Sequence, residues 1–282
     1  AFDRLAREVL NLPGHRVASL QAHAGGSPLY AIQMAGAWLD DAPVEPAELP
    51  FRDVGRVWAV RIDRVMDARP EHEQIALELA AVLGQEVETR RWAQACQLWS
   101  PPIEMPGPLL DALMTRRLWL PSTPPGITGG KFAHGQLRNH LLERAEAAGR
   151  LPDLHRLCAQ TFRGSTAPGD RARRARHLLA AGDDAAALEP LIEAADEDVR
   201  RGHLLHAELT LRAYQDATER LGLVDTDPRV RRGWLYRARC ARLLGLLADA
   251  GRAAERALVE DSVGQDPQLV AEARYEMAST LN

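Results

Sequence analysis

Apolar residues recur at helical spacing along most of this chain. Val57, Trp58, Ile62 and Val65 lie on one face of an amphipathic helix, and Gly84 is expected to end the helix that follows it. The same spacing predicts further helices around Leu29–Leu39, Ile75–Leu83, Leu109–Leu113, Leu137–Ala145 and Leu154–Thr161. The chain is therefore predicted to be mainly α-helical.

One short segment departs from this pattern and predicts a β-hairpin. Two strands are predicted at 117–120 and 131–133, and a loop rich in proline and glycine at 121–130 joins them. Helices followed by a short hairpin are typical of a winged-helix-like domain. Beyond His134 the pattern is helical throughout, apart from a turn-rich break at 164–170.

Two segments near the C-terminus resemble each other. Asp227-Pro228 and Asp266-Pro267, 39 residues apart, both have the form of a helix N-cap followed by a first-turn proline. At the same offset Val230 corresponds to Leu269. Self-similarity at such a period predicts stacked helical hairpins, that is, an α-solenoid, with an irregular helical bundle as the alternative.

Composition narrows the classes of function. Hydrophobic residues make up 46% of the 282 residues but aromatic residues only 5%, which favours helices over sheets. No apolar run reaches the roughly 18 residues that a membrane-spanning helix needs. The net charge of −4 provides no overall attraction to nucleic acid. Arginine-rich stretches at 171–176 and 229–242 hint at DNA binding, but acidic residues are interleaved through most of the chain and argue against it.

The cysteines and the start of the chain bear on location and completeness. Cys96, Cys158 and Cys240 are odd in number and widely spaced, and they predict reduced thiols in the cytoplasm. No secretory leader is visible. The chain begins mid-pattern at Ala1-Phe2-Asp3 without an initiator methionine, so we expect it to be a piece of a longer protein.

The stretch before Lys131, the only lysine, is the first candidate for phosphate chemistry. A phosphate-binding loop requires G-x-x-x-x-G-K-[ST], but here Pro125 takes the first glycine position and Phe132 the hydroxyl position. A hairpin loop is the preferred interpretation.

His203 and His206 lie one helical turn apart, but a zinc site needs a third ligand from elsewhere, so a solvated helix face is preferred. No catalytic constellation and no metal site are predicted.

Four segments in a fixed order suggest a family. They are Gly25–Tyr30 (GGSPLY), Ala80–Glu86 (AAVLGQE), Phe132–Arg138 (FAHGQLR) and His177–Asp183 (HLLAAGD). Together they resemble the C-terminal half of bacterial signalling ATPases of the STAND type, which are AAA-related proteins that combine an NTPase domain, a winged helix and TPR repeats. Such architectures occur in Ser/Thr protein kinases, class III nucleotide cyclases and LuxR-type transcription regulators, and this chain is most similar to the kinase-linked versions.

The resemblance implies nucleotide contacts at Gly26, Pro28 and His134. The proline of Gly26-Ser27-Pro28 corresponds to a residue that packs against adenine. His134 corresponds to a histidine that reaches the β-phosphate of ADP and favours the closed state. Ala133 and Gly135 depart from the related motifs, which have Arg and Asp at these places. A first-turn proline at Pro28 and a structural residue at a strand-to-helix junction at His134 stay open as alternatives.

The resemblance also implies a division of the chain into three parts. Residues 1–48 correspond to the helical end, or lid, of an NTPase domain, 49–165 to a winged-helix-like regulatory domain, and 166–282 to TPR-like helical repeats. ATP or ADP would bind only together with an upstream NTPase core, because the P-loop and Walker B acids would precede Ala1.

The predicted function follows from this division. We expect a regulatory and protein-interaction segment of a signalling ATPase, with no enzyme activity of its own. Its partners would be the upstream nucleotide-binding domain, a protein bound by the solenoid and further copies on activation. Two alternatives stay open: a DNA-binding winged-helix regulator with a TPR sensor, and a free-standing TPR scaffold.

Overall fold

The computed structural model shows a mainly α-helical protein with a small β-sheet, as predicted. It describes residues 54–121, 128–259 and 266–280, together with Gly14, Val17, Ala18, Met34 and Ala35, which are helical. The predicted segment 1–48 lies almost entirely outside the described residues. The chain divides into two compact units, unit 1 (Ala1–Leu154) and unit 2 (His155–Asn282), and the predicted three-part division stays a prediction.

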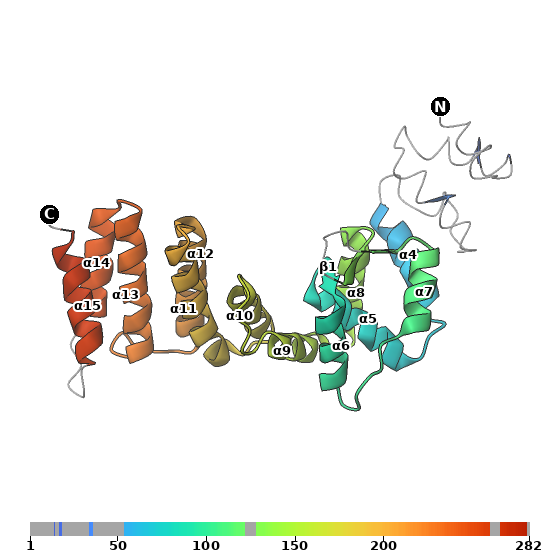
Figure 1. Cartoon of the computed structure of the whole chain (residues 1–282), viewed down its shortest axis with the longest axis horizontal. Coiled ribbons are helices and arrows are strands. Elements are labelled where there is room, and N and C mark those ends of the chain that lie inside the picture. Colours follow the sequence, from blue (N-terminus) through green and yellow to red (C-terminus); the bar gives the residue numbers. More distant parts are fainter. Residues whose placement is uncertain are drawn as a thin grey trace. The chain divides into compact units, whose positions relative to one another are not determined.

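Unit 1 contains the sheet and the helices around it (Figure 1). Its described elements are α4 (Val54–Met66), α5 (Glu71–Leu83), β1 (Glu86–Glu88), α6 (Thr89–Leu98), α7 (Gly107–Thr115), β2 (Trp119–Pro121), β3 (Gly129–Phe132) and α8 (Gly135–Ala147). Helix α9 (Leu151–Thr161) follows. The helices predicted from apolar periodicity at α4, α5, α7 and α8 are confirmed.

The sheet has three antiparallel strands in the order β1-β3-β2. The predicted hairpin is confirmed as β2 and β3, but β2 begins later than predicted because Arg117 adopts a left-handed conformation (φ 54°) and ends the turn after α7. Strand β1, which pairs Val87 with Gly130, is a correction to the sequence analysis, which had assigned no element to residues 85–99. Helix α6 was missed in the same stretch.

Aromatic side chains form the core beside the sheet. Trp92 on α6 is buried, and its indole N–H donates a 2.6 Å hydrogen bond to the Ala76 carbonyl. The Trp119 ring lies 5.5 Å from that of Trp92 and packs edge-on against Phe132 at 5.0 Å. Trp119 also covers Gly130 on the neighbouring strand, where a Cβ atom would lie 1.9 Å from its indole nitrogen. The sheet therefore depends on a glycine at that position.

Two groups of charged side chains join α5 and α4 to residues that come much later in the sequence. Glu78 on α5 is fully buried, and both of its oxygens accept hydrogen bonds from Arg150, at 3.0 and 2.7 Å. The carboxylate of Asp63 on α4 contacts His140 and Arg144 of α8, at 2.9 and 2.6 Å. Partial burial raises the pKa of Asp63, but the hydrogen bond and charge of His140 and those of Arg144 outweigh it and hold that pKa below 3.8.

Unit 2 is a series of helices in which each packs against the next (Figure 1). They are α10 (Asp170–Ala180), α11 (Asp184–Arg200), α12 (Leu204–Arg220), α13 (Pro228–Leu243), α14 (Leu247–Ala257) and α15 (Pro267–Ala278). Second neighbours also touch, since α13 contacts both α11 and α15. The break predicted at 164–170 separates α9 from α10.

The ends of these helices follow a shared local pattern. Gly182, Gly202, Gly222 and Gly245 each follow a helix with φ between 65° and 77°. At Gly202 the chain forms a Schellman turn, in which the N–H groups of Gly202 and His203 donate to the carbonyls of Val199 and Asp198. The predicted N-caps are confirmed, because the carboxylates of Asp227 and Asp266 accept hydrogen bonds from the first turns of α13 and α15.

Candidate functional site

The predicted nucleotide contact at His134 lies between β3 and α8. His134 is the N-cap of α8, and its Nδ1 accepts a 3.2 Å hydrogen bond from the Gln136 N–H. Its ring stacks on Trp58 of α4, with 5.5 Å between centroids and 11° between planes. Because Nδ1 is an acceptor, a neutral His134 carries its proton on Nε2. Within the described ranges Nε2 makes no hydrogen bond, so it can donate to an added acceptor.

The other two predicted contacts, Gly26 and Pro28, lie outside the described residues. The stretch tested as a phosphate loop does not have the required helix after its lysine. Lys131 lies in β3, opposite Glu86 of β1 and Leu120 of β2, so this part of the prediction, a hairpin, is confirmed. A phosphate-binding role for Lys131 has no structural support.

A groove on unit 2 brings apolar, aromatic and charged side chains together. It lies against α12, α13 and α14 and encloses about 510 Å³. The apolar side chains at its edge include Leu205, which is 72% exposed, and Leu246, which is 50% exposed. Trp234 of α13 contributes an aromatic ring. Exposed leucines beside a half-buried tryptophan are typical of a surface that binds another molecule.

Arginines dominate the charge of this groove. Four of them, Arg212, Arg237, Arg252 and Arg256, face two carboxylates, Glu208 and Asp249. Arg212 and Arg237 share Glu208 at 3.1 Å each, and Arg252 pairs with Asp249. The groove therefore has an excess of positive charge.

Arg256 is the groove's available cation. Its guanidinium lies 4.5 Å from the centre of the Trp234 ring, and Arg237 lies 5.4 Å from the same ring. In the part of the chain that the structure describes, Arg256 pairs with no carboxylate. A carboxylate of a bound molecule could therefore join Arg256 above an aromatic platform.

Sequence reasoning marked Arg229–Arg242 as a basic stretch but not as part of a groove. Most of its arginines are paired within unit 2: Arg232 contacts Glu189 at 2.7 Å, and Arg242 contacts the buried Glu276 at 2.6 Å. Their role is thus to join α13 to α11 and α15. The groove has no sequence signal of its own, because its lining comes from three separate helices.

The histidine pair gains a third potential ligand in the structure. Asp198 at the end of α11 lies beside His203 and His206, and one ligand atom from each lies within 4.8 Å of the others. The sequence analysis lacked this residue because the turn at Gly202 brings it back toward the histidines.

The thiols show no reactive environment. Cys96, Cys158 and Cys240 are buried, and none of them forms a disulfide among the described residues. Burial raises the pKa of Cys96 to about 12. Burial, reinforced by the charge of Glu208 and opposed by that of Arg237, raises the pKa of Cys240 to about 11. These two thiols are therefore protonated at neutral pH and are poor nucleophiles.

Comparisons with protein-family models, curated proteins and solved structures find no match to this chain. Among the described helices, none has both the length and the apolar character required to cross a bilayer.

Proposed function

We propose that this chain is the regulatory and protein-interaction segment of a multidomain signalling ATPase. In this proposal the helices of unit 2 bind a partner protein, and the region α4–α8 responds to ATP or ADP held by an upstream NTPase core. The observation that carries the proposal is the groove of α12–α14, which combines apolar, aromatic and cationic groups. The chain itself has no assigned catalytic role, and the buried, reduced thiols support a cytoplasmic location.

Two features of the fold support the finer assignments. In unit 1 the elements follow the order helix, strand, helix, helix, strand, strand, and the sheet order is β1-β3-β2, which supports the proposal of a winged helix. In unit 2 the contacts of α13 with both α11 and α15 are typical of a TPR-like solenoid, in which alternate helices line one surface. Both names are proposals that rest on topology.

Direct DNA binding is the less favoured alternative. In a DNA-binding winged helix the helix before the hairpin enters the major groove. Here that helix is α7, and its sequence GPLLDALMT contains one charged residue, Asp111, which is acidic. A helix without basic side chains gains nothing from the phosphate backbone.

The groove is expected to bind an acidic segment that carries one large apolar side chain. Leu205, Leu246 and Trp234 would contact the apolar side chain, and Arg256 a neighbouring carboxylate. We expect Trp234→Ala and Arg256→Ala each to weaken binding by about 10–30-fold, since buried aromatic and arginine anchors dominate such interfaces. Fluorescence anisotropy with labelled twelve-residue peptides, rich in glutamate around a single leucine or tryptophan, measures this loss.

Two controls accompany that measurement. Arg200→Ala changes an exposed arginine outside the groove, already paired with Asp196, and should leave peptide binding unchanged. Peptides with lysine in place of glutamate should not bind. Equal binding by the wild type and Trp234→Ala would remove the groove from the proposal.

The nucleotide response is expected to depend on His134. In the protein extended to include its upstream region, His134→Asn should lower ADP affinity about tenfold, because the donor at Nε2 is lost from a contact with a charged phosphate. Asparagine still supplies an N-cap acceptor, so the stability of α8 should be kept. Isothermal titration calorimetry with ADP measures the affinity, with the exposed His72→Ala as control. Unchanged ADP affinity would favour the free-standing scaffold instead.

A further inference from the structure

The turn between α11 and α12 brings three metal-binding side chains together. Asp198 lies in the last turn of α11, His203 is the N-cap of α12, and His206 lies in the first turn of α12. The His203 N–H donates to the Asp198 carbonyl at 2.8 Å, closing the Schellman turn at Gly202. The backbone therefore holds the carboxylate beside the first histidine, and helical spacing places the second histidine on the same side.

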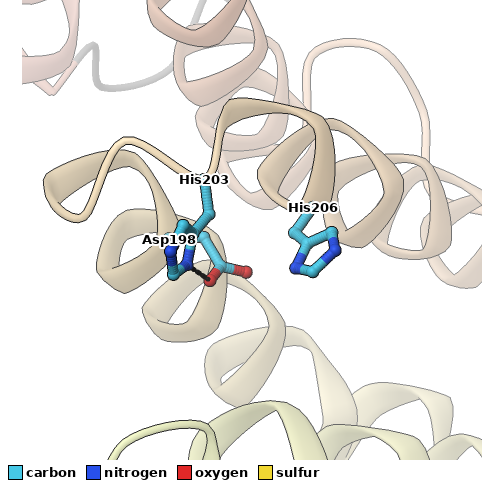
Figure 2. A group of neighbouring side chains, drawn as sticks. All are labelled: Asp198, His203 and His206. Carbon is cyan, nitrogen blue, oxygen red and sulfur yellow. Dashed lines mark ion pairs between the residues drawn. The ribbon is translucent and has the colours of Figure 1, made fainter.

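The distances between the possible ligand atoms fit a divalent ion. His203 Nδ1 lies 3.5 Å from Asp198 Oδ1, close to the spacing of about 3.4 Å between ligand atoms around a tetrahedral zinc ion. The three atoms all lie within 4.8 Å of one another. Figure 2 shows the carboxylate between the two imidazole rings, with His206 facing it from α12. Rotation of the His206 side chain, which is exposed, would bring its nitrogen closer.

The neighbouring charges leave this carboxylate available. The adjacent arginines are engaged elsewhere, because Arg200 pairs with Asp196 and Arg201 with Glu197, both at 2.9 Å. The partial negative charge at the C-terminus of α11 and the partial positive charge at the N-terminus of α12 meet at this turn and offset each other. The charge presented to a cation is thus mainly that of Asp198, which has 22% of its side chain exposed.

We propose that Asp198, His203 and His206 bind one divalent transition-metal ion of the zinc class. Two imidazoles and one carboxylate suit Zn²⁺, Co²⁺, Ni²⁺ or Cu²⁺ and disfavour Mg²⁺ and Ca²⁺, which take oxygen ligands. Three protein ligands leave a coordination position for water or for a group from another molecule. The bound ion joins the end of α11 to the start of α12 and stabilises unit 2.

The proposal is tested by zinc titration of the full chain after treatment with a chelator. Isothermal titration calorimetry should show one Zn²⁺ per chain, with affinity at least tenfold lower in each of His203→Ala, His206→Ala and Asp198→Asn. His72→Ala, an exposed histidine on α5, should bind as the wild type does. Millimolar Mg²⁺ should not compete, and Co²⁺ should give visible absorption bands in the wild type that both histidine substitutions abolish.

Thermal unfolding provides a second readout. Zinc at about 100 times its dissociation constant should raise the melting temperature of the wild type by roughly 5–10 °C, and the three variants should lose this shift. Because the two histidines are exposed and Asp198 is partly exposed, the variants should melt like the wild type without metal. Zinc affinity that survives both histidine substitutions, or equal competition by Mg²⁺, would overturn the proposal.

Discussion

Replacement of Arg150 by methionine is expected to lower the free energy of unfolding of unit 1 by about 3–5 kcal/mol. Arg150 is the partner of Glu78, whose side chain is fully buried and whose two oxygens both accept from the guanidinium. The same contact raises the pKa of Arg150, so the guanidinium is charged at neutral pH. Without it the buried carboxylate has no cation and no hydrogen-bond donor among the described residues, which is costly.

Urea denaturation followed by tryptophan fluorescence measures this loss. Five of the six tryptophans lie in unit 1, so the signal reports mainly on that unit. The double variant Arg150→Met, Glu78→Leu should recover to within about 1 kcal/mol of the wild type, because an apolar pair often replaces a buried ion pair at little cost. Glu71→Gln is the matched control: Glu71 is 78% exposed and 3.8 Å from Arg150, and its loss should cost under about 0.5 kcal/mol. A mild effect of Arg150→Met would show that water reaches Glu78.

Gly130→Ala is expected to destabilise unit 1 by about 2–3 kcal/mol. The added methyl group would lie 1.9 Å from Trp119 Nε1, and it can be accommodated only if the ring moves. That ring is 5% exposed and is held between Trp92 and Phe132, so it has no free space to enter. The pairing of β3 with both neighbours should weaken together with the aromatic core.

Gly107→Ala is the control for this effect. Gly107 begins α7, has no atom within 4 Å of a built Cβ, and does not have a positive φ. Alanine there should be neutral or slightly stabilising, because glycine is the poorer helix former. Urea midpoints and the near-ultraviolet circular dichroism of the tryptophans compare the two variants. If Gly130→Ala is as stable as Gly107→Ala, the packing of Trp119 is less restrictive than its contacts imply.

The helical part of the fold was predictable because its signals are local. In α4, Val57, Trp58 and Ile62 repeat at helical spacing, and all three are buried. The caps at Asp227 and Asp266 need only a carboxylate and a following proline. Strand β1 has only three residues, so no alternation is visible, and it forms because β3, more than 40 residues later, offers its free edge.

A candidate site could be predicted from the sequence only where the spacing of residues within one short segment indicated it. The spacing of His203 and His206 is legible in the sequence, but Asp198 reaches them only through the turn at Gly202. The groove on α12–α14 depends on how three helices pack, which no single segment encodes. His134 was located by its motif, and the structure added the Trp58 ring that lies against it.

Glycines illustrate the same division most clearly. By itself the sequence determined a mainly helical chain, its caps and its hairpin, because spacing, capping and turn chemistry act within a few residues. It could not distinguish Gly130, which lies under Trp119, or Gly233, where a Cβ would lie 2.6 Å from the Tyr214 ring, from glycines that merely end helices. Only the tertiary structure decided these contacts, together with the groove and the Asp198 cluster, because each joins side chains that the backbone brings together across separate elements.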